Sequence, residues 1–182
     1  MVLNSPDLKK AMTGSRASRR RKSQRDRLWA DAEEVVFPTK LGGWAQIPRT
    51  APMIGTLIDQ IRKKESAGRL YLVLWSYEFG DGFVEVPDPA MVALEAGYTM
   101  SRAERSFNER MRVLCELGFI RTAPLGVREF GYVLLVNPHP VVARLRAHAD
   151  FPDGWWSTFQ ARCAMAGIEL LEPSPGPTTS SG

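Results

Sequence analysis

The segment 102–109 carries four polar side chains of types that recognise the edges of base pairs. They are Arg102, Arg105, Asn108 and Glu109. An arginine can donate two hydrogen bonds to a guanine, and an asparagine can bridge an adenine. The segment therefore carries the chemistry of DNA base recognition, provided that these side chains share an exposed helix face.

The sequence predicts a helix over 102–117 that presents these side chains. Ser101-Arg-Ala-Glu104 has the S-x-x-E pattern of a capping box, and Gly118 is a typical helix stop. The apolar residues of the segment recur at spacings of four, four and three, which is one helix face; they are Ala103, Phe107, Met111 and Leu114. The opposite side then carries Arg105, Asn108, Glu109, Arg112 and Glu116, and the two glutamates dilute its positive charge. This interpretation requires that Arg102, Arg105 and Arg112 be neither covered by other helices of the chain nor engaged by neighbouring carboxylates.

The elements around this helix can also be predicted. A densely apolar segment predicts a buried helix over 69–79, and the Gly80–Gly82 turn leads into a short strand over 83–86. Asp88-Pro89 is a helix start, and that helix ends at Gly97. Strands are expected over 119–123 and 130–136, joined by a hairpin loop over 124–129.

This order of elements within 68–138 resembles the winged helix-turn-helix DNA-binding domains of bacterial transcription regulators and plasmid replication proteins. The resemblance is carried by Met91–Gly97, Ser101–Arg112 and Leu114–Ile120. It implies an α+β fold, mostly α, that binds double-stranded DNA with helix 102–117 in the major groove. In that pose Thr99 and Ser101 would bind phosphate, while Arg128 at the wing tip and Arg121 would contact the backbone or minor groove.

The flanking segments complete the expected organisation. Residues 1–24 are low in apolar content and predict a disordered arm, followed by a helical extension over 25–67. That extension holds a short helix over 25–35, a strand near 44–47 and a helix over 52–65. Closing helices are expected over 141–148 and 153–166, within 139–172, with Asp153 as an N-cap, and a disordered tail over 173–182. Helices 52–65 or 141–166 are expected to supply apolar surface for a homodimer.

Basic charge is concentrated in two places. Residues 1–28 have a net charge of +7 and residues 99–146 a net charge of +4, whereas 29–98 and 147–182 are net acidic. Such a layout is typical of nucleic-acid binders. In the arm, the expected phosphate contacts are Arg16, Arg19, Arg20, Arg21 and Lys22.

Other function classes lack a sequence signature. No nucleotide-binding, nucleophile-elbow or metalloprotease motif is present, so we expect no enzyme, no catalytic residue and no cofactor. Cys115 and Cys163 lie far apart, His139 and His148 have no ligand-spaced partner, and no metal is expected. No apolar run could span a membrane and no signal peptide is evident, so a cytoplasmic location is expected.

Three functions fit these patterns. The first is a DNA-binding transcription regulator, acting as a repressor at an operator. The second is a plasmid or mobile-element replication or partition protein that binds repeated sites. The third is a winged-helix module that contacts protein, in which the charges of helix 102–117 only solvate its surface. Promoter footprints, binding to iterated origin repeats, and salt-independent partner capture without DNA would distinguish the three.

Overall fold

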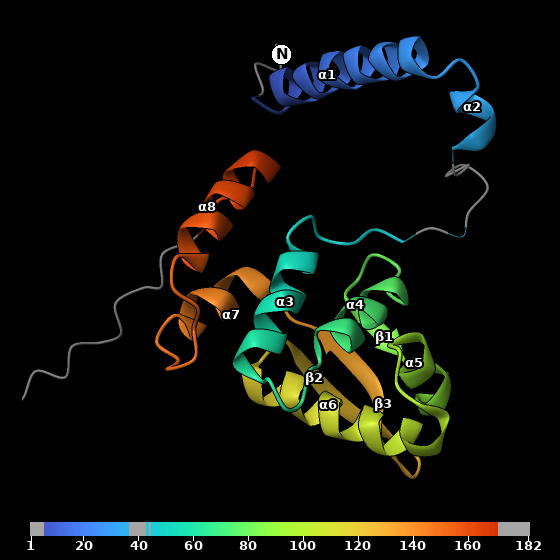
Figure 1. The fold of residues 1–182 in the computed structure, drawn as a ribbon, viewed down its shortest axis with the longest axis vertical. Coiled ribbons are helices and arrows are strands. Elements are labelled where there is room, and N and C mark those ends of the chain that lie inside the picture. The colour runs from blue at the N-terminus through green and yellow to red at the C-terminus, as the bar shows by residue number, and fades with distance from the viewer. Residues whose placement is uncertain (1–5, 37–42, 44, 171–182) are drawn as a thin grey trace, which may run out of the picture. The chain divides into compact units, whose positions relative to one another are not determined.

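The computed structural model describes residues 6–36, 43 and 45–170, and these fall into two compact units, Met1–Gly43 and Trp44–Gly182 (Figure 1). Across the described residues the fold is α+β and predominantly helical, with a three-stranded antiparallel sheet in the second unit. The expected fold class is therefore confirmed at this coarse level. The predicted disordered tail at 173–182 lies outside the described residues.

The first unit consists of two helices, α1 (Pro6–Leu28) and α2 (Ala32–Val35). This differs from the expected disorder over 1–24 and the single short helix expected over 25–35. Low apolar content excludes a core, but it does not exclude a helix. Between Pro6 and Leu28 the chain is rich in Arg and Lys, which are strong helix formers, and after Pro6 at the helix start Gly14 is the single strong helix breaker.

In the second unit, α3 (Ala51–Ile61) and α4 (Gly68–Ser76) pack closely against each other. A Cβ atom on Gly68 would lie 2.1 Å from the carbonyl oxygen of Gly55, so no side chain fits at this crossing. Asp59 Oδ1 accepts a hydrogen bond of 2.7 Å from the backbone N–H of Gly68. Glycine at both positions thus sets the distance between the two helices.

The next three elements are α5 (Pro89–Glu95), a 3₁₀ turn η2 (Met100–Arg102) and α6 (Ala103–Leu117). The Asp88 side chain accepts a hydrogen bond from Ala90 N at 2.9 Å, which confirms the predicted start of α5. Gly118 has a φ of 84°, a left-handed conformation that ends α6 as expected. The predicted capping box was wrong: Ser101 lies inside the 3₁₀ turn, and no side chain caps α6.

The sheet contains β1 (Phe83–Glu85), β2 (Ile120–Leu125) and β3 (Arg128–Leu135) in the order β1-β3-β2. One face carries Val84, Ile120 and Val133 into the core. The other face carries Phe83 and Leu134, which pair across β1 and β3 and stay partly exposed. The expected hairpin loop over 124–129 shortens to a turn at Gly126 and Val127, because β2 and β3 extend into it.

The chain closes with α7 (Pro138–Leu145) and α8 (Trp155–Ala166). His139 Nε2 lies 3.1 Å from Thr50 Oγ1 and so joins α7 to the start of α3, while the Trp155 and Phe159 rings stack at 4.8 Å. Two local expectations were wrong. Gly154, not Asp153, precedes α8 as its cap, and residues 45–48 form no strand.

The apolar faces of the flanking helices are already used within the chain. The residues of these faces are almost completely buried in the core; they are Ile54, Leu57 and Ile58 of α3, Val141, Val142 and Leu145 of α7, and Phe159 of α8. Little apolar surface of these helices is left exposed, with Met165 of α8 as the large apolar side chain that stays in solvent. A homodimer through these helices stays a prediction.

Candidate nucleic-acid interface

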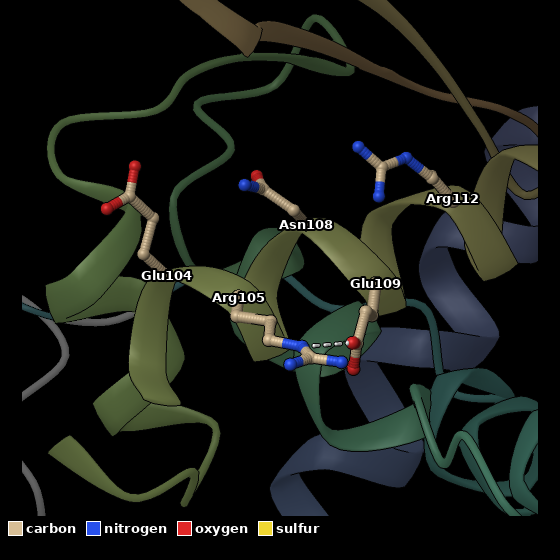
Figure 2. A pocket seen from close by; sticks show the side chains of 5 residues that line it. All are labelled: Glu104, Arg105, Asn108, Glu109 and Arg112. Carbon is tan, nitrogen blue, oxygen red and sulfur yellow. Dashed lines mark hydrogen bonds and ion pairs between the residues drawn. The ribbon is translucent and has the colours of Figure 1, made fainter. Parts of the chain in front are cut away.

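Helix α6 is oriented by its apolar stripe. Ala103, Phe107, Met111 and Leu114 are buried, as the spacing predicted, and the Phe107 ring meets the Phe130 ring edge-on at 6.3 Å. The polar side chains of α6 must then point outward. Five of them line a shallow hollow of about 400 Å³ on the outer face of the helix; they are Glu104, Arg105, Asn108, Glu109 and Arg112 (Figure 2).

These five side chains form two rows. Figure 2 shows Glu104, Asn108 and Arg112 on one side of the helix, and Arg105 with Glu109 on the neighbouring side. Within the second row, Arg105 Nε donates a hydrogen bond of 2.8 Å to Glu109 Oε1. The Arg105 guanidinium holds the pKa of the Glu109 carboxyl below its usual range, and the same bond raises the pKa of Arg105. Arg110 Nη1 also binds Glu109, at 2.7 Å.

Arg112 links α6 to the β2–β3 hairpin. Its Nη2 donates a hydrogen bond of 2.7 Å to Glu129 Oε2 at the start of β3, and its guanidinium lies 5.8 Å from the centre of the Phe130 ring. The requirement stated from the sequence is therefore met only in part. Arg105 and Arg112 are exposed, with side-chain exposures of 78% and 53%, yet each is engaged by a carboxylate.

Arg102 and Asn108 meet that requirement. Arg102 is exposed and Asn108 is partly exposed, and neither side chain has a hydrogen-bond partner among the residues that the structure describes. Thr99 and Ser101 are exposed in the turn before α6, where no side chain caps the helix. The backbone N–H groups of Arg102 and Ala103 are bonded within the 3₁₀ turn, so the N-terminal end of α6 offers a ligand two hydroxyls and an arginine.

Glu116 is less of an obstacle than the sequence indicated. The helical spacing of the sequence places Glu116 with Glu109 on the proposed DNA face, where its negative charge would repel phosphate. In the structure its carboxylate is bonded to the Arg62 guanidinium, at the C-terminal end of α3. Its charge is compensated there, away from the N-terminal half of α6.

The hairpin arginines make contacts that the sequence did not predict. Arg128 directly follows the Gly126–Val127 turn and pairs with Leu125, but its Nη1 donates hydrogen bonds to the carbonyl oxygens of Val86 (3.1 Å) and Pro87 (3.0 Å), and so ties β3 to the loop before α5. Val127 is the fully exposed residue of the turn. Arg121 pairs in register with Leu134 and lines a hollow on the outer sheet face, apart from the residues that line the α6 hollow.

In the first unit, the basic residues that were expected in a disordered arm lie on α1 instead. Arg16, Arg19, Arg20 and Arg21 are exposed. The Lys22 ammonium is bonded to Glu33 and lies 3.8 Å from Asp26, so its charge is compensated locally. Arg25 Nη2 binds the same two carboxylates. Local carboxylates thus neutralise some cations of the arm, while others keep their charge exposed.

No group of three or more His, Cys, Asp and Glu side chains that could hold a metal ion occurs among the described residues. In the same part of the chain, no helix is both long enough and apolar enough to cross a membrane. Neither a protein-family model, nor a curated protein, nor a solved structure matches this chain. Its function must therefore be inferred from geometry alone.

Proposed function

We propose that α4–β3 is a winged helix-turn-helix domain that binds double-stranded DNA in a sequence-specific manner, with α6 in the major groove. The order α4, β1, α5, α6, β2, β3 supports this proposal, as does a sheet in which the β2–β3 hairpin directly follows α6. In Figure 1 the turn of that hairpin projects beside α6, where a wing would meet the flanking groove.

The observation that carries the proposal is the division of α6 into two faces. Its apolar side chains are buried in the core, so the helix is held rigidly, and its outer face offers arginine and asparagine groups. A rigid helix with donors of this kind suits the major groove, which is wide enough to admit it. Arg102 and Asn108 can act directly because they have no competing partner among the described residues.

Arg105 and Arg112 would change partners on binding. Both ion pairs are solvent-exposed, and exposed pairs contribute little because water screens them and the long side chains lose conformational freedom. A phosphate or a guanine edge can therefore replace Glu109 or Glu129 without a large cost. The glutamates would then disfavour binding at sites that cannot supply that replacement.

We propose that the DNA site is an operator and that the protein is a transcription regulator, most simply a repressor that occludes a promoter. The same domain would serve a replication or partition protein equally well. Genome-wide mapping of bound DNA separates the two roles, because a regulator is found at promoters and a replication protein at iterated origin repeats.

One observation favours a second candidate function, that of a protein-binding module. Arg105 and Arg112 are compensated by glutamates, and Phe83 and Leu134 leave apolar surface on the outer face of the sheet. A protein partner would use that sheet face and leave α6 in solvent. DNA binding is the stronger proposal because α6 combines exposed side-chain donors with two exposed hydroxyls, Thr99 and Ser101, before its first turn.

The test is the double variant Arg102→Ala/Arg105→Ala. Each lost base contact should reduce the discrimination between the selected site and random DNA by about 1–3 kcal/mol. The matched control is Lys63→Ala/Lys64→Ala, which removes the same charge from an exposed loop of the same unit. Competition binding at fixed salt measures both variants. If the first variant discriminates as well as the wild type does, α6 does not read the bases.

A further inference from the structure

Helix α1 has two different faces from Arg16 onward. On one face, Lys22 and Arg25 are bonded to Glu33, and Arg25 also binds Asp26 at 2.6 Å. These contacts hold the end of α1 against α2 and neutralise the cations involved. The pKa of the Glu33 carboxyl lies below its usual range because both Lys22 and Arg25 donate hydrogen bonds to it.

The opposite side of α1, which we call the open face, consists of Arg16, Arg20, Ser23, Gln24 and Arg27. At 3.6 residues per turn these five positions fall within about 100° of one another, and Lys22 and Arg25 lie about 150° from their centre. All five are exposed, and Arg20, Ser23, Gln24 and Arg27 together line one hollow. Among the described side chains, no carboxylate pairs with any of the three arginines.

The open face carries chemical groups that can read base edges in addition to binding phosphates. Gln24 can form two hydrogen bonds with an adenine, and Arg20 and Arg27 on either side of it can each do so with a guanine. From Arg16 to Arg27 the helix rises about 16 Å, which matches roughly five base pairs of B-DNA. Among residues 16 and 18–28, the part of α1 whose burial is described, none is buried.

We propose that α1 is a second DNA-reading helix, whose open face lies in the major groove and contacts base edges next to the site bound by α6. This inference rests on the proposed DNA-binding function and extends it, because the arm then adds sequence information as well as charge. DNA fits better than RNA does, since the major groove of B-DNA admits a helix whereas that of an A-form duplex is too narrow for side chains to read.

The experiment selects preferred sequences from a random DNA pool with the full chain and with three variants. Arg20→Ala/Gln24→Ala removes the centre of the open face. Arg21→Ala removes charge from another side of the same helix, and Arg102→Ala/Arg105→Ala removes the contacts proposed for α6. All positions are exposed, and circular dichroism verifies that helix content is retained.

The wild type should select a composite site with two groups of specified base pairs. Arg20→Ala/Gln24→Ala should remove the sequence preference at one of these groups of base pairs. The preference there should fall by about 5-fold or more, which corresponds to the lower bound for one lost base contact. Arg21→Ala should weaken binding uniformly and preserve both groups. The α6 variant should erase the other group only.

Failure of the inference and failure of the proposed function give different results. If Arg20→Ala/Gln24→Ala leaves the selected site unchanged while the α6 variant alters it, α1 contacts only phosphates and the inference is overturned. If the wild type selects no DNA sequence at all, the proposed function fails. Binding of an RNA hairpin that depends on Arg20 and Gln24, without a matching DNA preference, also overturns the inference.

Discussion

Helices α6 and α1 both expose arginines, but they hold them in different ways. In α6 a buried stripe that includes Phe107, Met111 and Leu114 fixes the helix, and two of its outward arginines have glutamate partners. In α1 no described residue is buried, and the carboxylate partners neutralise one face only.

Under the proposed DNA-binding function, this difference predicts a division of labour. A helix held by a core keeps its donors in fixed positions, and local glutamates would lower its attraction to non-cognate DNA. A highly charged helix outside a core gains affinity chiefly from counterion release, which depends steeply on salt. We therefore expect α6 to respond to changes in packing and α1 to respond to ionic strength. Three changes test this contrast.

The largest effect is expected from Gly68→Ala. The added methyl group would collide with the Gly55 backbone, where neither helix can yield without moving the core that supports α6. The free energy of unfolding of the second unit should fall by about 3 kcal/mol, at the upper end for overpacking. Urea denaturation measures it. The control Ser66→Ala, at an exposed neighbouring position, should change the free energy of unfolding little. If Gly68→Ala is as stable as the wild type, the crossing of α3 and α4 is not tight.

Deletion of residues 1–28 should have the next largest effect, on binding rather than on folding. The segment carries a net charge of +7. If it engages five or six phosphates, the slope of log K against log salt should flatten by roughly 5. Binding isotherms between about 50 and 200 mM salt measure the slope. The urea midpoint of the second unit should not move. An unaltered slope would mean that α1 does not contact the DNA backbone.

Glu109→Gln should have the smallest effect and in the opposite direction. It removes the carboxylate that binds Arg105 and Arg110, so a guanidinium becomes available to DNA. We expect tighter binding to random DNA and a salt slope steeper by about 0.9, the contribution of one further phosphate contact. Glu116→Gln is the matched control on the same helix, because its carboxylate binds Arg62 instead. Similar gains from both variants would contradict a specific role for the Arg105–Glu109 pair.

Much of the framework of the candidate site could be predicted from local patterns. The spacing of Phe107, Met111 and Leu114 predicted which side of α6 is buried, and Asp88 predicted where α5 begins. The Arg105–Glu109 pair is also local, at a spacing of four residues on one helix, and the sequence already contained that signal. The α1 helix was missed because we judged 1–24 by its apolar content rather than by its helix propensity.

The sequence by itself determined the start of α5, the end of α6 and the buried side of α6, because each depends on interactions among residues a few positions apart. Only the tertiary structure decided which arginines keep free donors. Glu129 accepts a hydrogen bond from Arg112, which lies 17 residues earlier in the chain. Arg128 donates to the carbonyl oxygens of Pro87 and Val86, which lie 41 and 42 residues earlier. The folding of the hairpin against α6 and against the loop before α5 brings these partners together. The spacing of the residues along the chain therefore gives no signal for such pairs.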